Sequence, residues 1–467
     1  MITEHQLTGK RIGFGISLLL TAMIAFPGFS LKAGAQAQTP VTLPATQAAA
    51  SSDAQTTTAA ATQTNADAAV VPAAQPAQSQ PMTELPVIKI ITEDQKMPTC
   101  TKLLPPDETL AGATITDNDY VSGVMAISGT GVTAGTWQMK FKVRGNTSAV
   151  DKDKKPYKIK LDDAADLMGR GEAYADKEWV LLNSGTNLKT WLGLEVSRTL
   201  GMEWTPEMRF VTLEINGERR GLYILIESVK KAPKRVALSS GGYLFEDDAY
   251  WWNEDAYFKT TTQPWIMGYT FKYPEVKSSG DASVLALKSV MQSVDQKIAT
   301  GKSSVYHQID RTSWAKWIMA RDILGQEDPY GSNIYFYKKS GGDKIHMGPL
   351  WDFDSAFLVK KNWSKAHVVE GLPFCKLFAM ADGQFIAEYG SIWIGLIPSL
   401  ESTLNARMDA LQKSQGAAID KARTQDQQRW GGNRVSLADE IRTDKTLLHE
   451  QIAWMNGEIS KMIVPAK

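Results

Sequence analysis

A short predicted β-hairpin with an acidic loop at each open end is the strongest constraint on how this chain can fold. Residues 334–337 form one apolar strand, a Gly/Asp turn follows, and the second strand ends in an Asp-Phe-Asp triplet at residues 352–354. Asp328 and Asn333 precede the first strand. Because the open ends of a hairpin are neighbours, these two loops must lie close together. Crowded carboxylates repel one another unless a cation lies between them, and oxygen ligands of this kind suit Mg²⁺.

The spacing of the polar residues in these loops is that of a phosphotransferase. Asn333 follows Asp328 by five positions, and Asp352 follows Asn333 by nineteen. In this order such enzymes place a catalytic carboxylate, a metal-binding amide and a metal-binding carboxylate. We therefore expect a metal–nucleotide site. A glycosidase, in which Asp328 and Asp352 would flank a sugar, stays open, although an asparagine ligand and basic strands fit a phosphate better.

The N-terminus has the pattern of an export signal. Lys10 and Arg11 precede an apolar run at residues 12–29, and small residues follow as far as Ala37. This pattern predicts a signal peptide over residues 1–37 that is cleaved after Ala37. The alternative is an uncleaved single-pass anchor, because the run approaches bilayer length. We expect a periplasmic, cell-surface or secreted protein with no stable membrane span after cleavage.

The mature chain is predicted to be a tether followed by an α+β domain. Residues 38–84 are rich in Ala, Gln, Thr and Pro and have almost no large side chains. Such a segment cannot bury enough area to offset its ordering entropy, so it is predicted to be disordered. Residues 85–230 are predicted to be rich in strands. Residues 231–467 are predicted to be rich in helices and to contain the acidic hairpin.

Hydrophobic periodicity places the individual elements. Strands are predicted at residues 87–91, 121–128, 138–143, 157–161, 179–182, 209–215 and 222–226. Helices are predicted at residues 188–200, 283–300, 310–324, 392–415 and 437–463. Asn216-Gly217, between the last two strands, is a strong hairpin signal.

Charge and cysteine content exclude several classes of protein. Lys plus Arg equals Asp plus Glu at 51 each, so no net charge favours nucleic acid as a partner. Cys100 and Cys375 are the only cysteines. An oxidising compartment would allow a disulfide between them, but their spacing does not require one, and CxxC chemistry is absent. The five histidines show no metal-binding spacing.

A basic segment upstream supplies positive charge for a phosphate. On a strand over residues 157–161, Lys158 and Lys160 share one face while the residues between them point into the core. The preceding turn contains Arg144, Asn146 and Ser148, and it offers backbone N–H groups and small polar side chains that could cap phosphates. The alternative is a solvated edge strand with protective lysines.

Taken together, these segments resemble the CotH (spore coat protein H) kinases, which are secreted or surface-associated atypical protein kinases. The resemblance rests on Arg-Gly-Asn-Thr-Ser at residues 144–148 with Lys-Lys-Pro-Tyr-Lys-Ile-Lys-Leu at 154–161, on residues 216–227, and on residues 328–354. It covers roughly residues 85–463. It implies a bilobal protein-kinase-like fold with a strand-rich N-lobe and a helix-rich C-lobe. It also implies Mg-ATP as the donor, with Mn²⁺ as a possible substitute, and Ser or Thr of a protein as the acceptor.

The resemblance assigns roles to the acidic loops. Asp328 is similar to the catalytic aspartate, which accepts the proton of the acceptor hydroxyl or orients that hydroxyl. Asn333 and Asp352 are similar to the metal ligands, and Asp354 is a possible second carboxylate.

It also assigns roles in the N-lobe. Lys158 or Lys160 would contact the phosphates, and Glu195, on the predicted helix 188–200, would hold that lysine. An exposed helix charge is the alternative for Glu195. Glu227, at the end of an apolar strand, would face the adenine.

The chain departs from ordinary protein kinases in two places. Gln326-Glu327 stand where His-Arg would precede the catalytic aspartate, and Asp354 stands where most kinases have glycine. A second hypothesis is therefore a non-catalytic cell-envelope or surface protein that retains the fold as an interaction module.

Overall fold

The computed structural model of the chain describes residues 81–463, apart from residues 111, 184–186, 264–265, 327–332, 359–372 and 433–434. All described residues belong to one compact unit within Ala69–Lys467. The predicted signal peptide lies outside the described residues, and so does the predicted tether as far as residue 80.

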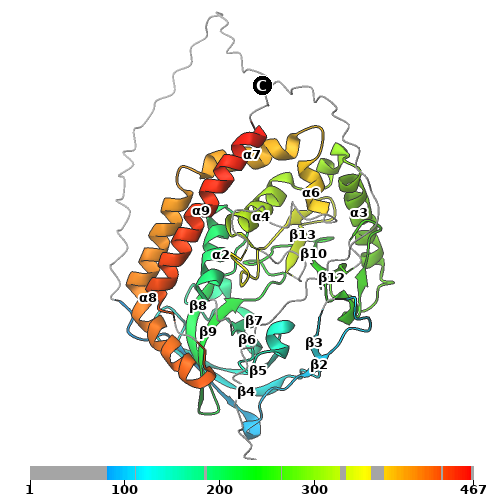
Figure 1. Cartoon of the computed structure of the whole chain (residues 1–467). Helices are drawn as coiled ribbons and strands as arrows, with labels where there is room; N and C mark the ends of the chain where they lie inside the picture. The colour runs from blue at the N-terminus through cyan, green and yellow to red at the C-terminus, as the bar shows by residue number, and fades with distance from the viewer. Residues whose placement is uncertain are drawn as a thin grey trace, which may run out of the picture. The chain divides into compact units, whose positions relative to one another are not determined.

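Seven strands form a closed barrel (Figure 1). They are β1 (Val87–Thr92), β4 (Val121–Ser128), β5 (Gly135–Val143), β6 (Tyr157–Ala165), β7 (Asp176–Leu182), β8 (Met208–Ile215) and β9 (Glu218–Glu227). Their order around the barrel is β1-β4-β5-β6-β7-β9-β8. Neighbours pair antiparallel except β1 and β8, which run parallel from the pair Val87↔Thr212 and close the barrel. The sequence predicts all seven strands, but it does not predict that they close.

Buried and half-buried side chains alternate along the first part of β6, so every second residue faces the barrel core. Tyr157, Ile159 and Leu161 are buried in one apolar cluster inside the barrel. Lys158 and Lys160 are half-buried on the outer face. This is the arrangement expected from the period of a strand. The turn between β8 and β9 is Asn216-Gly217, whose positive φ angles of 53° and 81° fit the predicted hairpin.

A second sheet has the strand order β11-β12-β10-β13-β14. Its strands are β10 (Tyr243–Asp248), β11 (Tyr257–Phe258), β12 (Gly268–Tyr273), β13 (Ile334–Lys338) and β14 (His346–Met347). The pair β13–β14 is the predicted hairpin, but β14 ends at Met347, so the Asp-Phe-Asp triplet at residues 352–354 follows the strand instead of ending it. The central strand β10 was not predicted, because it ends in three consecutive acidic residues. A small separate sheet pairs β2 (Thr101–Leu103) with β3 (Thr114–Thr116).

The helices lie mainly in the C-terminal half. They are α1 (Thr147–Val150), α2 (Asn187–Thr199), α3 (Ala282–Ala299), α4 (Arg311–Ile323), α6 (Pro373–Phe378), α7 (Gln384–Leu396), α8 (Leu400–Trp430) and α9 (Leu437–Ile463). The single helix predicted over residues 392–415 is wrong. The chain forms the end of α7 and the first part of α8 instead, because Pro398 cannot continue a helix.

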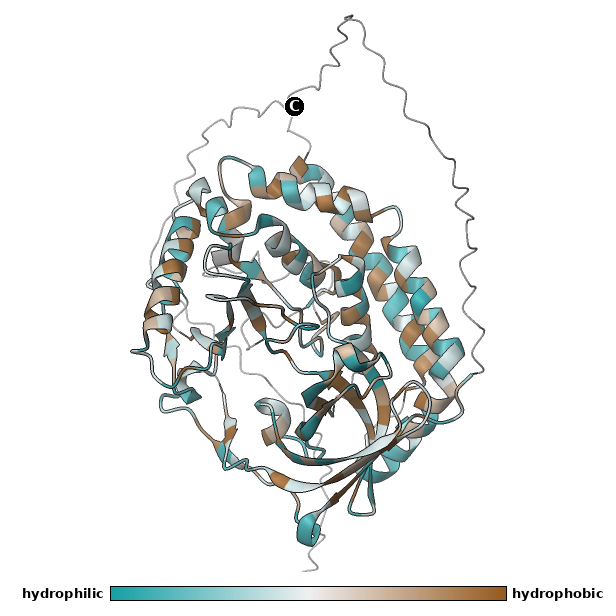
Figure 2. Ribbon diagram, turned by 180° about the vertical axis from the view of Figure 1, so that it is seen from behind, coloured by the Kyte–Doolittle hydropathy of each residue, from teal (hydrophilic) through white to brown (hydrophobic). Residues whose placement is uncertain are grey.

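The long helices α8 and α9 pack side by side (Figure 1), and apolar and polar residues alternate around them (Figure 2). Asp426 ties α8 to the barrel. Its carboxylate accepts from Nζ of Lys154 at 2.8 Å and from the backbone N–H of Leu222 at 3.1 Å. Gly221 makes room for it, since a Cβ at that position would lie 2.1 Å from Oδ1 of Asp426.

The described residues therefore form a mixed α+β fold with a strand-rich and a helical region, which confirms the predicted class. Among their helices, none combines the length and apolar character needed to cross a bilayer. Cys100 is a free thiol.

Candidate functional site

Asn333 meets the Asp-Phe-Asp triplet at residues 352–354 beside the β13–β14 hairpin. Asn333 directly precedes β13, and its Nδ2 donates to Oδ2 of Asp352 at 3.1 Å. The backbone N–H of Asp354 lies 3.4 Å from Oδ1 of Asp352. Both aspartates are exposed. The structure thus brings together the three predicted metal ligands, whereas Asp328 lies outside the described residues.

Phe353 anchors the triplet between its two exposed aspartates. Its ring is 1% exposed and packs against Gly193 of α2. A Cβ at Gly193 would lie 2.2 Å from Cγ of Phe353. The missing side chain therefore lets the ring approach the helix, and this contact fixes the position of the loop.

Asn333 and Asp352 both have unusual backbone conformations. Their φ angles are 94° and 60°, in the region that favours glycine. Such residues persist where the surroundings hold them, and they are common at functional sites. Here Gln326, a buried residue at the end of α4, donates from Nε2 to the backbone carbonyl of Asp352.

Strand β10 contributes residues that sequence reasoning missed. Glu246 is 3% exposed and accepts the backbone N–H of Asn333 at 2.5 Å and Nζ of Lys272 at 3.0 Å. Two residues further on, Asp248 accepts the backbone N–H of Tyr250 at 2.8 Å. The sequence did contain a signal for this strand. The apolar residues 243–245 lead directly into three consecutive acids, a pattern that indicates a strand ending at a polar site.

The electrostatics connect this strand to the predicted phosphate-capping turn. Burial raises the pKa of Tyr335, and Glu246 adds to the rise, while the positive charges of Lys272 and Arg144 oppose it. Arg144 therefore lies near the β10–β13 pair. Thr147, in the same turn, places its hydroxyl 3.4 Å from that of Tyr250.

The other two residues of the turn have structural partners. Asn146 accepts from the hydroxyl of Thr114 at 2.6 Å. Ser148 lies against Gly145, where a Cβ would be 2.7 Å from its Oγ. The turn is thus fixed on the barrel side and faces the second sheet with Arg144 and Thr147.

The expected ion pair between Glu195 and a β6 lysine does not form. Lys158 instead pairs with Glu178 of the neighbouring strand β7 at 3.2 Å. Glu195 binds Arg198 at 2.5 Å and Arg407 of α8 at 2.7 Å. The second partner comes from a helix far away in sequence, so the helical pattern around Glu195 could not predict it.

The outer face of the barrel near Lys158 is strongly basic. In the strand register, Lys158 lies opposite Lys142, and Lys160 lies opposite Lys140. Partial burial and the charge of Lys158 lower the pKa of Lys142. Glu178 therefore supplies the negative charge that the prediction assigned to Glu195.

Glu227 uses its carboxylate in a buried ion cluster. It is 1% exposed, and it lies 2.8 Å from Arg170 and 3.7 Å from Arg235. It also accepts the backbone N–H of Glu207 at 2.9 Å. These contacts stabilise the fold at the end of β9. They occupy the carboxylate that was predicted to face adenine.

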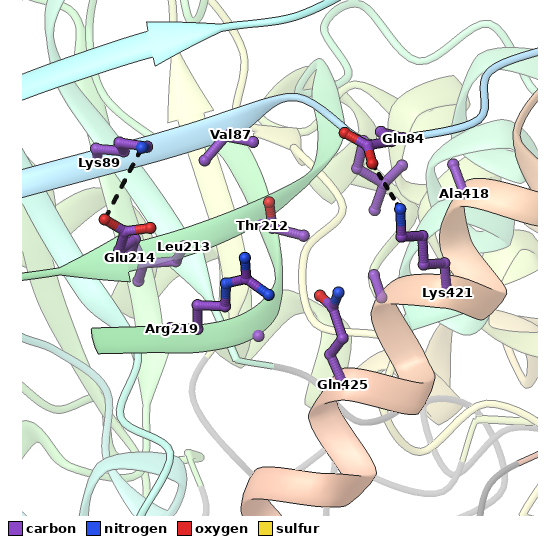
Figure 3. Close-up of a pocket in the computed structure, with 13 residues that line it drawn as sticks. Glu84, Val87, Lys89, Thr212, Leu213, Glu214, Arg219, Ala418, Lys421 and Gln425 are labelled. Carbon is purple, nitrogen blue, oxygen red and sulfur yellow. Dashed lines mark hydrogen bonds and ion pairs between the residues drawn. The ribbon is translucent and has the colours of Figure 1, made fainter. Parts of the chain in front are cut away.

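A groove of about 300 Å³ lies elsewhere on the barrel, between its outer face and α8 (Figure 3). Two ion pairs line it, Glu84–Lys421 at 2.5 Å and Lys89–Glu214 at 4.0 Å. It shares no lining residue with the Asn333–Asp352 pair.

The donor set at the Asn333–Asp352 pair fits a hard divalent cation in its chemistry. Carboxylate and amide oxygens are the ligands of Mg²⁺. Within the described ranges no three His, Cys, Asp or Glu side chains converge as a complete metal site. Asn333, Asp352 and Asp354 are the residues that would hold the ion, and a substrate phosphate and water usually supply the remaining ligands.

Comparisons with known proteins identify the family of this chain. Residues 141–453, most of the chain, match the family model described as CotH kinase protein. The chain belongs to the CotH kinase family. No curated protein matches it. Among solved structures it is similar to the Helicobacter pylori proinflammatory kinase CtkA, at 9% identity over 79% of this chain and 98% of that chain, with a TM-score of 0.30.

Proposed function

We propose that this protein is an extracytoplasmic protein kinase that transfers the γ-phosphate of Mg-ATP to Ser or Thr of a protein, or to itself. Membership of the CotH kinase family supports the chemistry. The single observation that carries it is the Asn333–Asp352 hydrogen bond at 3.1 Å, since it joins the two predicted metal ligands. The barrel and the region around the second sheet would be the two lobes of a kinase-like fold.

Each residue of the site then has a task. Asn333 and Asp352 would hold Mg²⁺, with Asp354 beside them, and the bound ion would neutralise charge on the transferring phosphate. Asp328 would orient the acceptor hydroxyl and accept its proton. Lys158, held by Glu178, and Arg144 would contact the phosphates.

A radiolabelled transfer assay tests the proposal. The mature protein is incubated with Mg²⁺ or Mn²⁺ and γ-labelled ATP, alone and with a hydroxyl-rich protein. We expect labelling by the wild type and none by Asp352→Ala or Asp328→Ala. A parallel calorimetric titration should show that Asp352→Ala loses metal-dependent nucleotide binding, whereas Asp328→Ala keeps it. If the wild type and both variants are equally inert, the chain is an interaction module that keeps the fold.

Export is a separate part of the proposal. The basic and apolar pattern of residues 1–37 supports it. Intact-mass measurement of the protein recovered from outside the cytoplasm should give a chain that begins at Gln38. A full-length chain retained in the membrane fraction would favour the uncleaved anchor.

A further inference from the structure

Glu246 is a buried carboxylate whose two oxygens bind groups from two different segments. Its side chain is 4% exposed. One oxygen accepts the N–H of Asn333 at 2.5 Å, and the other accepts Nζ of Lys272 at 3.0 Å. A buried carboxylate is costly unless it is paired and hydrogen-bonded. Both requirements are met here, so the three groups form one connected unit.

The partner Asn333 needs support at its backbone. A non-glycine residue at a φ of 94° is strained and stays there only when its neighbours hold it. The bond from its N–H to Glu246 fixes that backbone, and the side-chain amide then reaches Asp352. Gln326 does the same for Asp352 through its carbonyl. The backbones of Asn333 and Asp352 are thus each held by a buried polar side chain.

Lys272 reaches Glu246 from a β-bulge. The register of β10 and β12 shifts between Leu244↔Tyr273 and Phe245↔Phe271, which leaves Lys272 as the extra residue. Bulges of this kind re-aim a side chain and are common beside active sites. The lysine side chain is 31% exposed, and its ammonium pairs with Glu246.

We propose that Glu246 is a positioning residue for the metal site. It holds the backbone of Asn333 at the angle that places its amide beside Asp352, and it fixes the ammonium of Lys272 next to them, where that cation suits an anionic phosphate. This inference rests on the proposed function, because the Asn333–Asp352 pair must have a metal to hold.

Two matched double variants isolate the hydrogen bond to Asn333. Glu246→Gln with Lys272→Met keeps an acceptor for the N–H of Asn333 and removes the ammonium that would lose its partner. Glu246→Met with Lys272→Met has nearly the same shape but no acceptor. A third double variant, Glu246→Leu with Lys272→Met, also lacks the acceptor and replaces Glu246→Met with Lys272→Met if that protein does not fold. Thermal unfolding compares their stability.

The readout is Mn²⁺ binding in the presence of ADP, followed by the enhancement of water-proton relaxation that a protein-bound Mn²⁺ gives over Mn-ADP in solution. We expect the acceptor-free double variants to bind Mn²⁺ at least about tenfold more weakly than the double variant with glutamine, as for other residues that orient metal ligands. Equal Mn²⁺ affinity in all folded variants would overturn the positioning role and leave the proposed function intact. If the wild type itself bound no Mn²⁺, both would fall.

Discussion

At the residue scale, the site depends on close packing as much as on its acids. Phe353 reaches α2 only because position 193 is glycine. The aspartates on either side of Phe353 therefore keep their position through an apolar contact. The sequence indicated the acids through their spacing, but it contained no sign that Gly193 faces Phe353, since the contact joins segments about 160 residues apart.

Gly193→Ala tests this contact. The added Cβ would lie 2.2 Å from Cγ of Phe353, so the ring must move and carry Asp352 and Asp354 with it. Overpacking of this kind costs about 1–3 kcal/mol. We expect metal-dependent nucleotide binding to weaken at least about tenfold, measured by calorimetry.

The matched control is Gly457→Ala in α9, where nothing lies within 4 Å of the new Cβ. Removing a glycine from a helix interior should leave binding unchanged and stabilise the fold by about 0.5–1 kcal/mol. Unchanged nucleotide binding in Gly193→Ala would show that the contact between Phe353 and α2 does not fix the position of Asp352 and Asp354.

A buried acid beneath β10 should make stability depend on pH. Burial raises the pKa of Asp295 to about 6, although Thr260 and Tyr269 donate to it, and the same carboxylate raises the pKa of Asp247. The folded state therefore keeps a proton that the unfolded state loses from pH 3.8 upward. By linkage, stability falls as the pH rises from 3.8 to about 6, and the full penalty remains above that range.

Asp295→Asn removes this titration. The difference in unfolding free energy between the variant and the wild type should grow by about 2–3 kcal/mol, in favour of the variant, as the pH rises from 4 to 8. Urea denaturation at each pH measures it. Parallel pH profiles for the two proteins would contradict the assignment.

At the element scale, the sequence predicted local pattern well and long-range contacts poorly. The bounds of β4 and α9 agree with the predicted ranges 121–128 and 437–463, because strong periodicity fixes them. The barrel closure joins β1 to β8 across more than a hundred residues, and no local pattern reports it. Strand β10 was missed because its acidic end does not look like a strand, yet it supports the site.

The most buried of the ion pairs that attach α8 to the barrel joins Lys154 and Asp426, whereas Arg429 of α8 pairs with Glu218 of β9 near solvent. The side chains of Lys154 and Asp426 are 10% and 24% exposed. Asp426→Ala would leave a largely buried ammonium with the carbonyl of Leu222 as its remaining described hydrogen-bond partner. We expect the unfolding free energy, measured by urea denaturation, to fall by about 2–4 kcal/mol. This is somewhat less than the loss on breaking a fully buried ion pair, because both side chains keep some exposure.

Arg442→Ala is the matched control for this loss. Its side chain is 75% exposed in an i,i+3 pair with Asp439, so the change should cost under about 0.5 kcal/mol. Equal effects of the two substitutions would mean that the Lys154–Asp426 pair does not anchor α8.

At the scale of the whole molecule, the family match and the site point to the same chemistry. The match spans residues 141–453, which include β6 with its lysines, strand β10 with Glu246, and the Asn333–Asp352 pair. The sequence predicted that Asn333 and Asp352 would meet, because a hairpin joins them locally. It did not predict that Glu178 would partner Lys158 or that Glu246 would hold Asn333, because both contacts arise from pairing between strands.

The most direct test is a calorimetric titration of Mg-ATP into the mature protein and into Asp352→Asn, which removes one charge and little volume. The account predicts that the wild type binds the nucleotide only when Mg²⁺ or Mn²⁺ is present, and that Asp352→Asn loses this metal dependence while its thermal unfolding stays within a few degrees of the wild type. Nucleotide binding that is absent in the wild type, or that is indifferent to both the metal and the substitution, would contradict it.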